Sequence, residues 1–278
     1  MYRFVTIAAL SVACLPPAAP WPPSDVADVL DADADSDSDV DADADADSDL
    51  DADDTAAPVD CNSLVFVEDQ AYVSAGTNSI PGDAFYTDDV FTIELWAWFE
   101  TPVDLETYTL VTLGDPEAWW LGMDEGILKF QSGDDELEMA VAFDGWHHVG
   151  VVVDRPGDEI RMYLDGVRID ETLQDPGPMV QPVENQNLRF GRSSDAERGG
   201  LSWPHSIDEV RFAHEVKLSG TSPDLSPERT LDGWLGVWRF DNDLVNAVTG
   251  DTAAGGGVTY SSSSPFSSSD SPYYGVCP

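Results

Sequence analysis

The chain has 278 residues and a formal net charge of -42 at pH 7, which arises from 54 acidic and 12 basic side chains. This length fits one large β domain or two small domains and does not choose between them. So few basic residues leave no patch that could neutralise the phosphates of a nucleic acid, and we therefore expect no nucleic-acid partner.

The first twenty residues, MYRFVTIAALSVACLPPAAP, have the pattern of an export signal. Arg3 supplies one positive charge ahead of the apolar run 4–12, which is too short to anchor the chain across a bilayer. The stretch SVAC (11–14) resembles a bacterial lipobox, in which a cysteine is lipidated and becomes the new amino terminus. We therefore expect a signal over residues 1–14 with lipidation at Cys14. Ordinary signal cleavage, or a retained free Cys14, is the alternative.

Residues 15–60 are predicted to be a disordered spacer rich in Pro and Asp. Residues 21–60 hold 16 Asp and no Lys or Arg, and every odd position from 31 to 53 is Asp. Period two is typical of strands, but Asp and Ala are poor strand formers and like charges repel, so the run should stay disordered. It lacks the glycine that calcium loops of the DxDxDG type need at the turn, so we expect only diffuse attraction of counterions there.

From Cys61 onward the periodicity is that of β-strands. FTIELWAWFE (91–100) alternates apolar and polar residues. Three strands between residues 146 and 172 are separated by the turns RPGD (155–158) and Asp165-Gly166, which predicts an antiparallel meander because Asp-Gly between apolar runs is a strong hairpin signal. Further strand-like stretches are ILKFQ (127–131), LEMAVAF (137–143), LRFG (188–191), IDEVRF (207–212) and LGVWRF (235–240). No stretch has a helical stripe of four turns, so many short strands predict a sandwich or barrel.

The ordered set of strand motifs resembles the bacterial laminin G-like, concanavalin A-like domains over about residues 61–262. The motifs are FTIELWAWF, DGWHHVGVVVD, IRMYLDGVRI, LRFG, IDEVRF and LGVWRFD. The resemblance implies an all-β fold, a two-sheet antiparallel jelly-roll sandwich over residues 61–278, in a secreted or surface module that binds glycans or proteins. In WPHSIDEV, His205 stands where the family commonly has glycine, and this bulky side chain puts the role of the neighbouring surface in question.

Three cysteines are an odd number for an exported protein. If Cys14 carries lipid, Cys61 and Cys277 remain as a pair at the two ends of the folded part. A bridge between them would close a loop of more than two hundred residues and stabilise the fold by about 5 kcal/mol in the chain-entropy model. Two unpaired terminal cysteines are the alternative.

The adjacent histidines His147 and His148 are expected to be structural. Side chains alternate along a strand, so the two rings point to opposite faces and cannot chelate one ion. His205 and His214 lack further ligands at metal spacing, which argues against a zinc site.

The sequence does not place two carboxylates where they could act together as a catalytic pair. Asp134, Glu136 and Glu138 come closest to the acid pair of a glycosidase, but we expect them on a solvated outer face. Glu94 and Glu100 are six residues apart, about 20 Å along a strand, and cannot act on one bond. The sequence also lacks the Gly-x-Ser-x-Gly and HExxH motifs, so we expect no enzyme.

Calcium is the one cofactor that the resemblance admits. Related domains often hold an ion at a loop rim with carboxylates and carbonyl oxygens, which implies Asp208 as a candidate ligand with Asp195 as a helper. The alternative for Asp208 is that it caps a turn by accepting hydrogen bonds from backbone amides.

Exposed aromatic residues are the natural candidates for a ligand surface. In PEAWWLGM, a strand would bury one of Trp119 and Trp120 and present the other. Trp203, with His205 close by in the loop GGLSWPHS, is the second candidate. The tryptophans of strong strand patterns should mostly fill the sandwich; they are Trp96, Trp98, Trp234 and Trp238.

Together these features predict an exported lipoprotein at the outer membrane or cell surface, or otherwise a secreted or periplasmic protein. Its contact with the membrane would be the lipid anchor alone. We expect non-catalytic recognition of an extracellular glycan or protein. A glycoside hydrolase or polysaccharide lyase of the same fold, and a purely structural envelope lipoprotein, are the alternatives.

Overall fold

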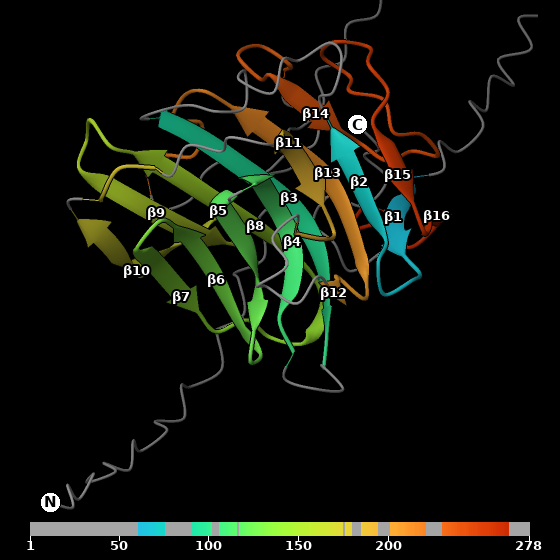
Figure 1. Ribbon diagram of the computed structural model, residues 1–278, viewed down its shortest axis with the longest axis horizontal. Coiled ribbons are helices and arrows are strands. Elements are labelled where there is room, and N and C mark those ends of the chain that lie inside the picture. Colours follow the sequence, from blue (N-terminus) through green and yellow to red (C-terminus); the bar gives the residue numbers. More distant parts are fainter. Residues whose placement is uncertain are drawn as a thin grey trace, which may run out of the picture. The chain divides into compact units, whose positions relative to one another are not determined.

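The computed structural model describes most of the region after residue 60 (Figure 1). The described ranges are 61–75, 90–101, 106–115, 117–174, 176–179, 185–193, 201–220 and 230–266. Within them, no helix is long and apolar enough to cross a membrane. The predicted signal (1–14) and spacer (15–60) lie outside the described residues.

One sheet, called sheet A, has eight strands that pair antiparallel. The strands are β1 (Ser63–Phe66), β3 (Val90–Glu100), β8 (Asp144–Asp154), β9 (Glu159–Leu164), β10 (Val167–Gln174), β13 (Ser206–Ala213), β14 (Gly236–Trp238) and β16 (Val258–Ser261). Their spatial order is β10-β9-β8-β3-β13-β1-β16, and β14 pairs with β13.

The other sheet, called sheet B, also has eight strands. They are β2 (Tyr72–Ala75), β4 (Tyr108–Asp115), β5 (Glu117–Asp124), β6 (Ile127–Ser132), β7 (Asp135–Met139), β11 (Asn185–Phe190), β12 (Leu201–Ser202) and β15 (Ala254–Gly256). Their order is β15-β2-β11-β4-β5-β6-β7, with β12 bridged in parallel to β4. The first four strands alternate between the sheets along the chain, which confirms the predicted all-β, two-sheet sandwich.

The core lies between the inward faces of the two sheets. The predicted alternation in β3 is confirmed, because its inward residues from Phe91 to Phe99 are fully buried. The ring of Phe91 stacks on Trp119 of sheet B at 5.4 Å and on Phe212 of sheet A at 5.8 Å. Each large side chain withdrawn from water in this way stabilises the fold by about 1.5–3 kcal/mol.

The predicted meander is confirmed in strands β8, β9 and β10. Asp165 and Gly166 form the two-residue turn between β9 and β10, and both have a positive φ, 50° and 73°. This backbone matches the twist of a hairpin and suits an Asp-Gly pair. The RPGD turn joins β8 to β9, where Asp154 pairs with Glu159.

The outward face of sheet A is also buried, which the sequence did not predict. Thr92 and Glu94 of β3 are nearly inaccessible to water. The Thr92 hydroxyl donates to the carbonyl of Glu215 at 2.7 Å and accepts from the N–H of Lys217 at 3.0 Å, so the segment after β13 lies against this face. Three small apolar clusters lie apart from the main core. They are Trp96 with Cys61 and Phe266, Leu218 with Val152 and Tyr163, and Trp234 with Ala213 and Val237. Trp96 and Trp234 therefore lie outside the main core, whereas Trp238 lies within it.

The two adjacent histidines point to opposite faces of β8, as predicted. The buried ring of His148 lies edge-on to Trp96 at 5.3 Å on the outward side. The ring of His147 contacts Phe99 of the main core and hydrogen-bonds to Asp144 and Asp165. Both rings have structural contacts and they share no ligand position.

Candidate functional site

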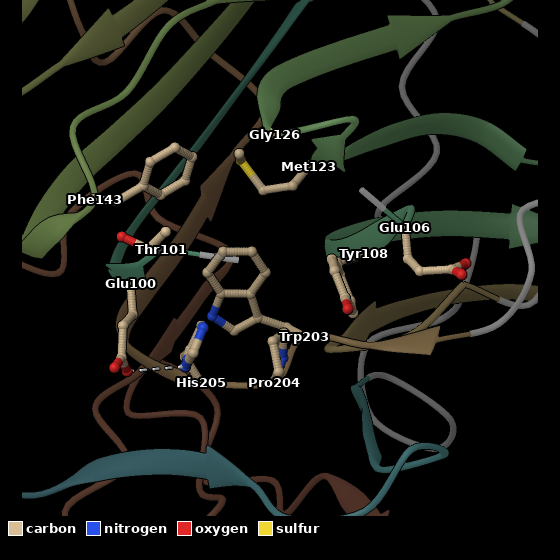
Figure 2. A pocket seen from close by; sticks show the side chains of 10 residues that line it. All are labelled: Glu100, Thr101, Glu106, Tyr108, Met123, Gly126, Phe143, Trp203, Pro204 and His205. Atoms are coloured by element: carbon tan, nitrogen blue, oxygen red, sulfur yellow. Dashed lines mark ion pairs between the residues drawn. The ribbon is translucent and has the colours of Figure 1, made fainter. Parts of the chain in front are cut away.

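A pocket of about 220 Å³ lies at one end of the sandwich, where strands of both sheets terminate (Figure 2). Sheet A contributes the end of β3 and the residue before β8, and sheet B contributes the start of β4 and the β5–β6 hairpin. The loop between β12 and β13 completes the wall. The apolar residues that line the pocket are Tyr108, Met123, Phe143, Trp203 and Pro204.

Backbone pairing positions Trp203 in the pocket. β12 runs beside β4, and the N–H of Trp203 donates to the carbonyl of Gly191 at 2.7 Å. Gly191 has a φ of 84°, and a Cβ added there would lie 2.1 Å from the ring of Phe66. A larger residue would therefore be strained at this positive φ and would have to displace the ring of Phe66.

The indole of Trp203 has a buried donor without a partner. The residue is 3% exposed, and no hydrogen-bond partner for its Nε1 lies among the described residues. Its ring packs edge-on to Phe99 at 5.2 Å and to Tyr108 at 6.5 Å. Figure 2 shows the indole in the middle of the lining side chains, with its nitrogen toward His205. An unpaired buried donor costs about 1–3 kcal/mol, and because this nitrogen is itself buried, Trp203 contributes its ring rather than its N–H to the pocket wall.

His205 also lines the pocket and is fixed at both its backbone and its ring. Its carbonyl accepts from the N–H of Phe66 at 3.2 Å, and its ring lies edge-on to Trp203 at 5.5 Å. Burial lowers the pKa of His205, although Glu100, with Oε2 at 3.9 Å from Nδ1, opposes this. The imidazole is therefore neutral at pH 7. The side chain of His205, at the position where the resemblance implies glycine, thus forms part of the wall.

Two glutamates give the pocket its negative charge. Glu100 ends β3, and its carboxylate is 67% exposed beside His205. Glu106 is exposed and lies just before β4. Figure 2 shows the two carboxylates on opposite sides of Trp203. Among the described residues that line this pocket, none is Lys or Arg.

The expectation that Trp119 or Trp120 presents an indole to solvent is wrong. Each is 1% exposed. Trp119 belongs to the ring stack of the core, and Trp120 donates its Nε1 to the hydroxyl of Thr109 at 2.9 Å on the other side of β5. The Trp120 ring also lies over Gly122, where an added Cβ would come within 2.4 Å of it. Alternation along the strand is correct, but both sides of β5 are shielded.

Asp208, the predicted calcium ligand, lies at a β-bulge and is buried. Its two oxygens accept from the N–H of Glu209 and from the hydroxyl of Ser264, each at 2.8 Å. Burial, followed by the neighbouring charge of Glu209, raises the pKa of Asp208 well above its usual value. Asp195 lies outside the described residues. Within the described ranges, no group of three or more His, Cys, Asp or Glu side chains is arranged to hold a metal.

The other carboxylates considered from the sequence lie away from the pocket. Glu136 and Glu138 on β7 pair with Lys129, at 3.8 and 2.7 Å. Glu94 is buried next to His148 at 3.6 Å and therefore does not share a site with Glu100. The predicted disulfide is only partly within the described residues: Cys61 is buried beside Trp96, and Cys277, like Cys14, falls outside them.

Sequence comparison matches residues 68–219 to a laminin G family model of the concanavalin A-like lectin/glucanases superfamily. The chain belongs to this superfamily. The resemblance read from the strand motifs is thus confirmed, and the matched span contains every residue of the pocket. No curated protein matches the sequence.

Comparison with solved structures finds similar chains, of which the first has a TM-score above 0.5 and shares the fold. A proposed carbohydrate-binding protein from Bacteroides ovatus has a TM-score of 0.53 and 14% identity, over 72% of this chain and 59% of its own. A SAP-like pentraxin from Limulus polyphemus has a TM-score of 0.44 at 13% identity, over 73% of this chain and 95% of its own. The CBM40 of a Ruminococcus gnavus sialidase, bound to sialyllactose, has a TM-score of 0.41 at 13% identity, over 53% and 86%. This chain therefore spans about three fifths of the Bacteroides protein.

Proposed function

We propose that this domain is a non-catalytic binding module that recognises a glycan through the pocket at Trp203. The observation that carries the proposal is the set of aromatic rings, those of Trp203, Tyr108 and Phe143, that line one pocket. Apolar rings pack against the C–H face of a sugar, and a few placed polar groups give orientation. The superfamily and the fold shared with the Bacteroides ovatus protein support a glycan.

The size of the pocket favours a small group over a protein surface. At about 220 Å³ it is smaller than the pockets of about 300–1,000 Å³ that hold drug-sized ligands. A stable protein interface buries about 800 Å² on each partner and needs a broad patch rather than a hole. One sugar ring at the end of a glycan suits this space.

Glycoside hydrolysis is the second candidate, because Glu100 and Glu106 place two carboxylates around one pocket. Such enzymes need two carboxyl groups that flank the scissile bond, and the general acid commonly lies in an apolar environment. Glu100 and Glu106 are both exposed, which favours binding without cleavage. Release of reducing sugar from a bound glycan, lost in Glu100→Gln or Glu106→Gln, would instead establish the enzyme.

We also propose that lipid on Cys14 anchors the protein at the outer membrane or cell surface. Residues 15–60 would then act as a spacer. A neutral flexible chain of this length averages about 40 Å from end to end, and the Asp run would extend it and repel an anionic surface. A Cys61–Cys277 bridge would close the sandwich behind this spacer. Metabolic labelling with a fatty acid, lost in Cys14→Ala, tests the anchor.

A glycan array tests the binding function. The full-length chain is applied in calcium and, separately, in chelator, together with Trp203→Phe and Trp146→Phe. The indole of Trp146 also has a buried Nε1 without a hydrogen-bond partner among the described residues, but Trp146 does not line the pocket, which makes it a matched control. We expect Trp203→Phe to lose binding about tenfold or more and Trp146→Phe to retain it. An array silent in both conditions, or equal losses in the two variants, would overturn the proposal.

A further inference from the structure

The outward face of sheet A becomes accessible to solvent toward the end of β3. Thr92 and Glu94 are nearly inaccessible under the segment that follows β13, and Trp96 is 7% exposed. Trp98 is half-buried and Glu100 is exposed. The pairing of β3 with β8 has no break in register, so these alternate residues lie on one side of the strand. The covered face therefore ends at Trp98.

The neighbouring strand β8 has the same gradient of exposure. His148 is buried, Trp146 is half-buried and Asp144 is exposed. In the register of the two strands, Trp98 lies opposite Trp146 and Glu100 lies opposite Asp144. A pair of tryptophans followed by a pair of carboxylates thus forms the open end of this face.

The indole of Trp98 is held in place and remains partly open to solvent. Its ring packs edge-on to Trp146, with centroids 5.8 Å apart and an angle of 77° between the rings. The Nε1 of Trp146 is buried without a partner, whereas the Nε1 of Trp98 is not among the buried unpartnered atoms of the described residues. Trp146→Phe would keep the edge-on packing. A ring that its neighbour already restrains loses little freedom when a ligand covers it.

Glu100 connects this surface to the pocket at Trp203. It lies two residues beyond Trp98, about 7 Å along the strand, and its side chain also lines the pocket. His205 lies between Glu100 and Trp203, with its Nδ1 at 3.9 Å from Oε2 of Glu100 and its ring 5.5 Å from the indole (Figure 2). A chain of sugars that passes over Glu100 therefore reaches both tryptophans, whereas one sugar in the pocket leaves Trp98 uncovered.

The charge beside Trp98 favours a neutral ligand. The carboxylates of Glu100 and Asp144 are 67% and 73% exposed, and their ion-pair partners among the described residues are the histidines His205 and His147. Carboxylates accept strong hydrogen bonds from hydroxyl groups. An acidic sugar would instead place its own charge beside both carboxylates, on a chain of net charge -42.

We infer that Trp98 forms a second subsite, where a neutral glycan whose end lies in the Trp203 pocket continues over Glu100 and packs a further sugar on the indole. This inference rests on the proposed glycan-binding function and extends its ligand from a terminal sugar to a neutral oligosaccharide. The ring of Trp98 contacts the C–H face of that sugar, and Glu100 and Asp144 accept from its hydroxyls.

Calorimetric titration of the full-length chain tests the second subsite. The ligands are the disaccharide and the pentasaccharide of the β-linked glucose, mannose and xylose series, and short and long forms of any glycan that the array identifies. We expect the pentasaccharide of the recognised series to bind about tenfold more tightly than its disaccharide, as one well-packed aromatic contact provides. Pentagalacturonic acid, the acidic counterpart, should show no such gain.

Variants assign the gain to Trp98. Trp98→Ala should remove it and leave the disaccharide unchanged, whereas Trp203→Phe should weaken both ligands. Trp98→Leu, which keeps apolar bulk at this position, should behave like Trp98→Ala, and urea unfolding checks that both variants are folded. Tyr72→Ala, at an exposed aromatic residue of sheet B outside the pocket, is the matched control and should keep the gain.

The outcomes separate the second subsite from the function on which it rests. Equal affinity for short and long forms, or a gain that persists in folded Trp98→Ala and Trp98→Leu, would overturn the second subsite. Disaccharide binding that Trp203→Phe weakens would then leave the glycan-binding function standing. An equal gain with pentagalacturonic acid would overturn the neutral class. No binding of any sugar, together with a silent array, would remove the binding function itself.

Discussion

Replacement of His147 by alanine is expected to destabilise the sandwich in a pH-dependent way. The ring nitrogens lie 2.7 Å from Oδ2 of Asp165 and 2.9 Å from Oδ1 of Asp144. A neutral imidazole carries one N–H, so only the protonated ring can donate to both carboxylates. Asp165 occupies the turn between β9 and β10 and also accepts from the backbone N–H of His148 at 2.9 Å. His147 therefore ties this hairpin turn to the start of β8.

The size of the expected destabilisation follows from these two hydrogen bonds and from how far they are exposed to solvent. A hydrogen bond to a charged group contributes about 1.5–3 kcal/mol when buried. The carboxylates of Asp165 and Asp144 are 46% and 73% exposed, so solvent screening reduces both contributions, the second to near that of a surface pair. We expect His147→Ala to lower the free energy of unfolding by about 1–2 kcal/mol where the ring is charged.

The pH window follows from the directions of two shifts. The hydrogen bond to Asp165 raises the pKa of His147 above 6.5, against the opposing effect of burial. Its stabilisation is complete below pH 6.5 and is lost as the pH rises through the folded-state value. Burial alone would raise the pKa of Asp165, but the bonds from His147 and from the His148 N–H lower it below 3.8. The stabilisation from the Asp165 carboxylate is therefore present above pH 3.8 and is lost as the pH falls through the lowered pKa of the folded state.

Urea unfolding followed by tryptophan fluorescence checks this reasoning at about pH 5.5 and about pH 9. A double-mutant cycle of His147→Ala and Asp165→Asn isolates the pair, because asparagine keeps an acceptor for the His148 N–H. The coupling energy should be about 1 kcal/mol at the lower pH and clearly smaller at the higher pH. His214→Ala, at an exposed histidine outside this contact, serves as the control. A coupling energy that is the same at both pH values would refute the argument.

Two further predictions concern buried groups. Asp208→Asn should stabilise the domain at pH 8, because a raised carboxyl pKa penalises the folded state above pH 3.8. Urea titration should show the gain vanish near pH 4, whereas a calcium-dependent rise of Tm that Asp208→Asn abolishes would instead assign Asp208 as a ligand. Non-reducing peptide mapping should recover Cys61 linked to Cys277, and Cys61→Ser should cost about 5 kcal/mol in the chain-entropy model. Recovery of both peptides as free thiols would contradict the bridge.

The strand pattern of the sandwich was accessible from the sequence because it is local. The alternation in β3 and the Asp165-Gly166 turn each depend on a few neighbouring residues, and both occur as predicted. The residues that line the pocket were predicted less completely than the strands. Trp203 and His205 line the pocket, but Glu106, Tyr108 and Phe143 carry no local signal, since strand ends far apart in sequence bring them together.

The sequence by itself determined the class of fold, through period-two patterning and turn chemistry that act within single hairpins. Only the tertiary structure decided which faces of the strands are exposed to solvent. Trp120 and Glu94 sit on the outward sides of their strands, as alternation requires, yet both are buried. The segment after β13 lies against the outward face of sheet A, and the Trp120 ring lies over Gly122 of its own strand. The pocket at Trp203 has the same origin: it exists where two sheets end together, and no single segment specifies that meeting.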